Sequence, residues 1–269
     1  MSISTGDKYH SKAETIPNTL RYRNIRILVV EDTKKAAKTL FKSFREDALA
    51  NLLVSHVEDQ NEKDILELTL YEAYVKQHIL KGIVLGINET DAGFETVGVW
   101  STPDSLKAGL DSFSNLMEAG YGRLWEINNE EGRQRIFNGM LPLLHDTCER
   151  ILETDSRFRN KGVYTLVYLG SLESARGKGN VRLMFDYMFE NYIDKSPNNV
   201  SYLESSSKSN IPIYDKFGFK FYEDIMLGSK ESENSIEGKD YAIMNVMIRG
   251  SSGHDWTQDE NTGSTQAKL

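Results

Sequence analysis

The spacing of apolar residues changes along the chain, and each spacing predicts one kind of element. Short runs rich in β-branched residues predict strands, whereas apolar residues three and four positions apart predict amphipathic helices. Asp32 and Thr33 directly follow the first such run and are expected to cap a helix. In chain order, the patterns of the first half predict a strand at 25–31, helices within 40–53 and 65–79, and an antiparallel hairpin of strands at 82–87 and 96–100.

The second half begins with about sixty residues of helical spacing, in which Pro142 is expected to cause a kink. Together the patterns predict an α/β (α+β) protein: a mixed central sheet of about seven strands flanked by helices, with a helical insertion over about 103–161 between the third and fourth strands. The later elements are a strand at 164–169, a helix over 183–193, a strand at 200–203, a short helix at 211–217 and strands at 219–225 and 241–248.

Both ends of the chain are polar, which predicts flexible tails at 1–22 and 250–269 around one domain at 23–249. The composition is 39% hydrophobic and 27% charged, enough to bury a core. A formal charge of −8 argues against a non-specific nucleic-acid binder, which needs a cationic face. No apolar run reaches the roughly 20 residues that span a bilayer. We therefore expect a cytoplasmic protein, with the nucleus as the alternative, and no nucleic-acid or membrane partner.

Cys148 is the only cysteine, so an intrachain disulfide is excluded and a thiolate metal cluster is not expected. His145 lies one helical turn before it, which raises the alternative of a thiol nucleophile. A cysteine in line with the apolar positions of a helix is more often a small core residue, and we favour that interpretation. We expect no metal.

The clearest chemical signal is a basic glycine turn between a buried strand and a helix. Gly177 and Gly179 allow the backbone to approach a ligand closely, and Arg176 and Lys178 add positive charge. Free amides at the start of the helix would then form a seat for a pyrophosphate. Such turns are also common on surfaces, and this one has neither the Walker spacing nor the six-position dinucleotide fingerprint.

The segment 164–192 resembles motif A of the GNAT acetyltransferases, with Arg176, Gly179 and Val181 at the diagnostic positions. Val181 departs from the small residue that the motif has there. The segment 203–219 is similar to motif B of the same superfamily, with Asn210 before a short helix and Tyr214 within it. Motif B is locally most similar to that of puromycin N-acetyltransferase-like members.

This resemblance implies an acetyl-CoA-dependent N-acetyltransferase, in which a primary amine attacks the thioester directly in a ternary complex. Tyr214 would protonate the leaving thiolate, and Glu204 would deprotonate the amine. The structural alternatives are that Tyr214 is a packed core residue and that Glu204 faces solvent. Asn210 could equally be a helix N-cap. The resemblance implies that the cofactor is bound by Leu169, Gly170, Ser171, Leu172, Arg176, Gly177, Lys178, Gly179, Asn180, Val181 and Asn210.

The acceptor is the open question. A small-molecule amine is the leading interpretation; a protein lysine or N-terminus and a non-catalytic acyl-CoA-binding or scaffold module are the alternatives. The insertion is expected either to cover the acceptor site or to form a homodimer face. The aromatic and sulfur-containing side chains that would do so are Phe113, Met117, Tyr121, Trp125 and Phe137.

Overall fold

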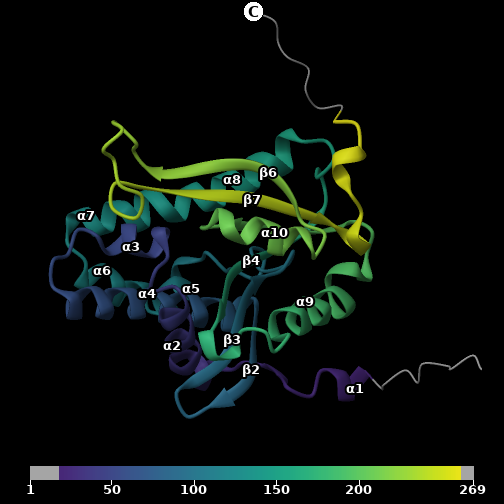
Figure 1. Cartoon of the computed structure of the whole chain (residues 1–269), viewed down its shortest axis with the longest axis horizontal. Coiled ribbons are helices and arrows are strands. Elements are labelled where there is room, and N and C mark those ends of the chain that lie inside the picture. Colours follow the sequence, from purple (N-terminus) through teal and green to yellow (C-terminus); the bar gives the residue numbers. More distant parts are fainter. Residues whose placement is uncertain (1–17, 262–269) are drawn as a thin grey trace, which may run out of the picture.

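Seven strands form one mixed sheet in the order β1-β2-β3-β4-β5-β7-β6 (Figure 1). In the computed structural model, which describes residues 18–261, β4 and β5 are parallel and the other neighbouring strands are antiparallel. The predicted mixed seven-stranded sheet is therefore confirmed. The strands are β1 (Ile25–Ile27), β2 (Ile83–Thr90), β3 (Gly93–Ser101), β4 (Gly162–Ser171), β5 (Asn199–Ser205), β6 (Lys220–Gly228) and β7 (Tyr241–Gly250).

Helices cover both faces of this sheet. Helix α9 packs on one face, and α2 and α4 pack on the other (Figure 1). The described α-helices are α1 (Asn18–Arg21), α2 (Thr33–Ser43), α3 (Ala48–Val54), α4 (Gln60–Lys81), α5 (Phe113–Ala119), α6 (Tyr121–Ile127), α7 (Glu130–Arg133), α8 (Leu141–Thr154), α9 (Asn180–Asn191) and α10 (Ile211–Asp215). No helix within residues 18–261 is both long and apolar enough to cross a membrane.

The alternation of side chains along β7 explains how helices pack on both faces of the C-terminal strands. Met247 packs with residues of α9 and α10, whereas Val246 and Ile248 pack with Ile151 of α8. Successive strand residues point to opposite faces of the sheet. A strand in which apolar residues follow one another, instead of alternating with polar ones, is therefore buried on both faces. The helical insertion between β3 and β4 is confirmed, and α8 is its last element.

The first strand is shorter than predicted. Pairing with β2 ends at Ile27, and a 3-10 turn, η1 (Val30–Asp32), leads into α2. Asp32 does not cap α2 with its side chain. Its carboxylate instead accepts hydrogen bonds from the Val29 amide at 3.0 Å and the Arg26 guanidinium at 2.7 Å, both of which lie before the helix.

The first predicted helix region contains two helices, α2 and α3, because Asp47 starts a new helix by accepting a hydrogen bond from the Ala50 amide. In the insertion, the backbone keeps helical dihedral angles through Met140 and Leu141, and Pro142 lies in the first turn of α8. The irregularity lies upstream, in the π-helical segment η2 (Gln134–Met140). A proline has no amide N–H to donate, so a carbonyl of the preceding helical turn lacks its usual hydrogen-bond partner. The hydrogen bonds of that turn therefore rearrange, and a π-helical segment is one such rearrangement.

The segment predicted to be a C-terminal tail packs on the sheet over part of its length. Two 3-10 turns, η6 (Ser251–Gly253) and η7 (Trp256–Gln258), follow β7. Trp256 is 5% exposed, and its indole N–H donates to the Ile248 carbonyl at 2.8 Å. At the other end, Tyr22 is also buried. The remaining tail residues, 1–17 and 262–269, lie outside the described part of the chain.

Candidate active site

The two parallel strands at the centre of the sheet separate before they end. Residues of β4 and β5 are in register from the Gly162–Asn199 pair to the Leu166–Leu203 pair. Both strands then continue, β4 to Ser171 and β5 to Ser205, but they no longer pair with each other. The edge of β4 that faces β5 therefore carries unpaired peptide groups, which need other hydrogen-bond partners.

A β-bulge in β4 coincides with this separation. Val99 of β3 is paired with Tyr168 and Trp100 is paired with Leu166, so Val167 is one extra residue on β4. A bulge bends the strand that carries it and increases its twist, which turns the end of β4 away from β5. Gly170 lets α2 approach this end closely, because a Cβ atom there would lie 2.9 Å from Leu40.

Two connected cavities occupy the space between the separated strands. The outer cleft has a volume of about 780 Å³ and lies between β4, the glycine turn and the segment before α10. The inner cavity has a volume of about 80 Å³, and residues of α3 and α4 line it together with residues of β4 and β5. Six residues line both of them: Phe44, Asp47, Leu169, Ser206, Asn210 and Tyr214.

Only some of the residues predicted for cofactor binding line the outer cleft. Those that line the outer cleft are Leu169, Ser171, Arg176, Val181 and Asn210. Those that do not line it are Gly170, Leu172, Gly177, Lys178, Gly179 and Asn180. The two residues predicted for acid and base chemistry, Tyr214 and Glu204, both line the inner cavity.

Tyr214 lies on α10 where the two cavities meet. Its ring packs edge-on against Phe185 at 6.2 Å and Phe219 at 5.9 Å between ring centroids. Burial, with a smaller contribution from the charge of Asp47, raises the pKa of Tyr214 to about 12. The phenol therefore keeps its proton at neutral pH and can donate it.

Glu204 lies on β5, one residue past the last β4–β5 pair, and it lines the inner cavity. Burial raises the pKa of Glu204 to about 7, because an ionised carboxylate is poorly solvated there. No cationic side chain lies within ion-pair distance of Glu204 among the described residues. A carboxyl group with a pKa near 7 is suited to act as a general base at neutral pH.

The glycine turn is held by a residue that the motifs do not include. Glu95 of β3 accepts hydrogen bonds from the side chains of Asn88 at 2.8 Å, Lys178 at 2.6 Å and Asn180 at 3.0 Å. These three hydrogen bonds lower the pKa of Glu95 to about 2. Lys178 and Asn180 thus attach the turn to the sheet, whereas Arg176 is exposed and lines the outer cleft.

The backbone of the turn has the conformation that the sequence suggested. Gly177 and Gly179 have φ values of +78° and +80°, in the left-handed region that glycine tolerates. Gly179 directly precedes α9, and the first amide groups of a helix have no acceptor within it. Asn210 precedes α10, but its side chain makes no capping hydrogen bond there. The N-cap alternative for Asn210 therefore does not describe this structure.

Two carboxylates that the sequence motifs do not include, Asp47 and Glu67, also line the inner cavity. Asp47 lies between α2 and α3 and accepts a hydrogen bond from the hydroxyl of Ser206. Glu67 lies on α4, is 7% exposed and accepts a hydrogen bond from Tyr71 at 3.3 Å. In the sequence, Glu67 lies beside Leu66 and Leu70 on the apolar stripe of a helix. A charged residue at such a position is rarely buried without a role, and this was the signal that could have identified it.

The insertion contributes little to either cavity. Leu144 is its one residue among those that line the inner cavity. Tyr121 packs against Tyr74, and Phe137 packs against Tyr121. The other three predicted lining residues are on the surface, with Phe113 78% exposed; the other two are Met117 and Trp125. None of these five side chains lines either cavity, and their predicted role at the acceptor site or at a homodimer face stays a prediction.

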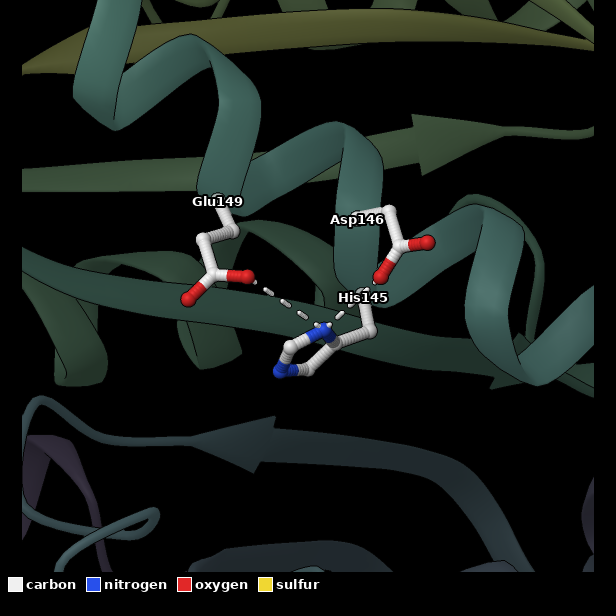
Figure 2. Close-up of side chains that lie close together, drawn as sticks. All are labelled: His145, Asp146 and Glu149. Atoms are coloured by element: carbon white, nitrogen blue, oxygen red, sulfur yellow. Dashed lines mark hydrogen bonds and ion pairs between the residues drawn. The ribbon is translucent and has the colours of Figure 1, made fainter.

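Cys148 and His145 do not form a catalytic pair. Burial raises the pKa of the Cys148 thiol to about 12, which disfavours the thiolate that a nucleophile requires. Figure 2 shows that the His145 ring faces Asp146 and Glu149 of the same helix, at 3.2 Å and 3.9 Å. These three groups are exposed to solvent, where water competes with them for any ion, and we assign no metal site to them.

Comparisons with known proteins agree with this geometry. No family model matches the chain. A curated protein of Schizosaccharomyces pombe, described as an uncharacterised N-acetyltransferase, is 32% identical over 219 residues, which cover 81% of this chain and 80% of the relative. An acetyltransferase structure from Corynebacterium glutamicum, described as a histone acetyltransferase and related acetyltransferase, has a TM-score of 0.52 at 16% identity over 85% of this chain and 96% of its own. Arylalkylamine N-acetyltransferase 2 of Aedes aegypti has a TM-score of 0.51 at 16% identity over 84% and 99%.

The sheet order, the separated central strands and these structural neighbours define the acetyltransferase fold of the GNAT type. The chain belongs to the GNAT superfamily of N-acetyltransferases and is an acyltransferase.

Proposed function

We propose that the protein transfers the acetyl group of acetyl-CoA to the primary amine of a small molecule. The observation that carries this proposal is the junction of the two cavities between β4 and β5, where Tyr214 and Asn210 line both. A donor in the outer cleft and an acceptor in the inner cavity would meet at this junction. The small volume of the inner cavity favours a small acceptor over a protein chain.

In this mechanism, the pantetheine arm lies along the unpaired edge of β4 and forms hydrogen bonds with its peptide groups, as an added strand would. The phosphates lie at the amides that begin α9, and Arg176 supplies positive charge beside them. Lys178 and Asn180 contribute indirectly, because their side chains hold the glycine turn in place through Glu95.

The chemical step needs three proton transfers. Glu204 takes a proton from the ammonium group, directly or through water, and the neutral amine attacks the thioester carbon. The C–N bond forms, the C–S bond breaks, and Tyr214 donates its proton to the departing thiolate. The nitrogen of the new amide then releases its second proton, which returns to the Tyr214 phenolate through water. The presence of both residues in the lining of the inner cavity supports this division of roles.

Calorimetric titration with acetyl-CoA tests the cofactor site. Arg176→Glu should weaken binding at least tenfold, because it places a negative charge beside the phosphates. Lys107→Glu makes the same charge change on an exposed loop of the insertion and should bind acetyl-CoA like the wild type. Gly179 is a poorer test position, since its φ of +80° would strain any side chain. Failure of the wild type to bind acetyl-CoA would contradict the proposal.

CoA release in the presence of small amines, and of peptides with a free N-terminus or lysine, tests the acceptor class. Turnover of small amines with little turnover of peptides is the expected result. A preference for peptides would favour the protein-acetyltransferase alternative and overturn the small-molecule assignment.

A further inference from the structure

The insertion between β3 and β4 packs against residues that form the wall of the inner cavity. Leu53 of α3, Tyr74 of α4 and Met244 of β7 line that cavity. The same three residues belong to one buried core cluster with Ile136 and Met140 of the insertion. The insertion therefore supports this wall from behind, although it adds little to the lining itself.

Arg135 of the π-helical segment η2 joins the insertion to two other segments. Its Nη1 atom donates hydrogen bonds to the Leu52 carbonyl of α3 at 2.6 Å and to the Ser55 hydroxyl. The same atom lies 3.4 Å from the carbonyl of Lys239, in the connection between β6 and β7, and the Ser55 hydroxyl donates to that carbonyl at 3.1 Å. The insertion, the C-terminal end of α3 and the β6–β7 connection thus meet at one guanidinium, and these segments lie together on the left of Figure 1.

The guanidinium itself is held in place. Its Nη2 atom pairs with Glu131, one helical turn earlier, at 2.6 Å, and the Arg135 side chain is 25% exposed. Hydrogen bonds from a charged donor are stronger than those between neutral groups. A cation beside the last carbonyls of a helix also interacts favourably with the helix dipole. These contacts therefore fix the position of the C-terminal end of α3.

A second contact holds the same end of α3. His56 lies two residues past the end of α3 and packs against Gly132 of α7. A Cβ atom on Gly132 would lie 2.5 Å from the His56 Nε2 atom, so α7 approaches this closely only because residue 132 is a glycine. Burial and the charge of Arg135 lower the pKa of His56, so its ring is neutral beside the guanidinium at neutral pH. The insertion thus holds α3 at two points.

The segments that Arg135 joins also border the site. Ala48, the first residue of α3, lines the outer cleft, as does Glu237 of the β6–β7 connection. Gly238 packs on Ala48, since a Cβ atom there would lie 3.5 Å from the Ala48 Cα atom. Helix α3 has 7 residues and is therefore about 10 Å long. A shift of its C-terminal end consequently moves the residues of α3 that line the cleft and the inner cavity.

We infer that Arg135 is a positioning residue for acceptor binding: it holds α3 and the β6–β7 connection in the arrangement that binds the acceptor, and it touches neither substrate. This inference rests on the proposed function, which places the acceptor in the inner cavity. Acetyl-CoA in the outer cleft depends on β4 and the start of α9, whose described residues form no hydrogen bond with Arg135. Loss of the guanidinium should therefore weaken binding of the acceptor and leave binding of the donor unchanged.

Hydrogen–deuterium exchange of the full-length protein tests the contacts directly. In Arg135→Gln, the amides of residues 48–57 and 229–240 should exchange about tenfold faster, because the hydrogen bonds that stabilise their arrangement are lost. The amides of α9 should exchange as in the wild type. Arg133→Gln is the matched control, because it removes the same charge two residues earlier, where the guanidinium donates to the Trp125 carbonyl within the insertion at 2.9 Å. It should leave all these rates unchanged.

Steady-state kinetics at saturating acetyl-CoA test the consequence for the acceptor. The probes are n-butylamine, 2-phenylethylamine and ethanolamine, and the amine with the highest turnover is used for all variants. Arg135→Gln should raise its KM by about five- to tenfold and change kcat by less than about twofold, because apparent affinity falls with the fraction of molecules in the binding arrangement. The Kd for acetyl-CoA should stay unchanged. Arg135→Lys keeps the charge and a donor, and it should recover part of the loss in KM.

Each failure has its own signature. Unchanged exchange of both segments in Arg135→Gln would overturn the role of Arg135 in holding them, and an unchanged KM despite faster exchange would overturn its role in acceptor binding. A fall in kcat, or a rise in the Kd for acetyl-CoA, as large as the change in KM would indicate general damage to the fold and would also overturn the positioning role. A wild type that binds acetyl-CoA but acetylates none of the three amines would overturn the proposed function itself, whatever the exchange rates are.

Discussion

Leu166 of β4 is paired with Leu203 of β5, and this is the last pair before the two strands separate. Both leucines pack on the face of the sheet that α9 covers, together with Tyr214. Because side chains alternate along a strand, Val167 and Glu204, the next residues, face the opposite side. The separation of the strands therefore connects the two faces of the sheet, so groups from both faces reach one cavity.

Replacing Tyr214 with Phe should lower kcat by about 10²-fold or more, because the variant lacks the proton for the leaving thiolate. The ring would still pack against Phe185 and Phe219, so stability and the Kd for acetyl-CoA should change little. Steady-state kinetics and calorimetry measure these quantities. Tyr164→Phe, which alters a tyrosine that lines neither cavity, is the matched control. A Tyr214→Phe enzyme with wild-type kcat would exclude Tyr214 as the acid.

The pH dependence of kcat/KM should show a limb with an apparent pKa near 7, the pKa that burial gives to Glu204. Activity should rise with pH through this limb, because the base must lose its proton before it can accept one from the acceptor. Glu204→Gln should lower kcat/KM by about 10²-fold and remove the limb. If the limb persists in Glu204→Gln, another group is the base.

Replacing Glu95 with Gln should raise the Kd for acetyl-CoA several-fold while changing kcat little. The carboxylate holds Lys178 and Asn180, and its loss would free the glycine turn without altering the groups at the cavity junction. Glu89→Gln is the matched control, because Glu89 lies in the same hairpin and pairs with Arg26 and Lys35 but not with the turn. Equal Kd values for the two variants would contradict this role of Glu95.

Glu67 should make the folded protein less stable as pH rises. Burial raises its pKa from 4.5 to about 7, so the folded state binds its proton more tightly than the unfolded chain. Its contribution to stability is complete below pH 4.5 and is lost as pH rises through 7. Glu67→Gln should therefore be more stable than the wild type at pH 8, by on the order of 3 kcal/mol at most, and similar at pH 4.5. Denaturant unfolding at the two pH values, with Glu62→Gln as the control, measures this; a difference that does not change with pH would contradict it.

The sequence predicted the order of the elements and the motifs around Arg176 and Tyr214 because these depend on local patterns: apolar spacing, a glycine turn and a short helix. It did not predict the inner cavity, because Asp47, Glu67 and Tyr168 are brought together from three separate elements. The spacing of residues within one segment does not indicate which distant segments will be in contact. The hydrogen bond between Lys178 and Glu95 could not be predicted for the same reason, since the two residues are 83 positions apart.

The polarity of the C-terminal segment predicts a tail, but its single tryptophan attaches the segment to the core. Trp256 packs against Phe158 at 5.3 Å and Tyr222 at 5.8 Å between ring centroids, in the cluster under α8. Large aromatic side chains dominate the burial of apolar surface, so one such residue can attach an otherwise polar segment to a core.

Trp256→Ala should consequently lower the free energy of unfolding by about 3–5 kcal/mol, the cost of removing a buried aromatic side chain and leaving a cavity. Trp256→Phe should recover much of this loss, but not the hydrogen bond from the indole N–H to the Ile248 carbonyl. Trp125→Ala is the matched control, because Trp125 of the insertion is 47% exposed and should contribute less to stability. Denaturant unfolding followed by circular dichroism measures all three variants. If Trp256→Ala were as stable as the wild type, residues 251–258 would be dispensable for the core, as the polarity of the segment had suggested.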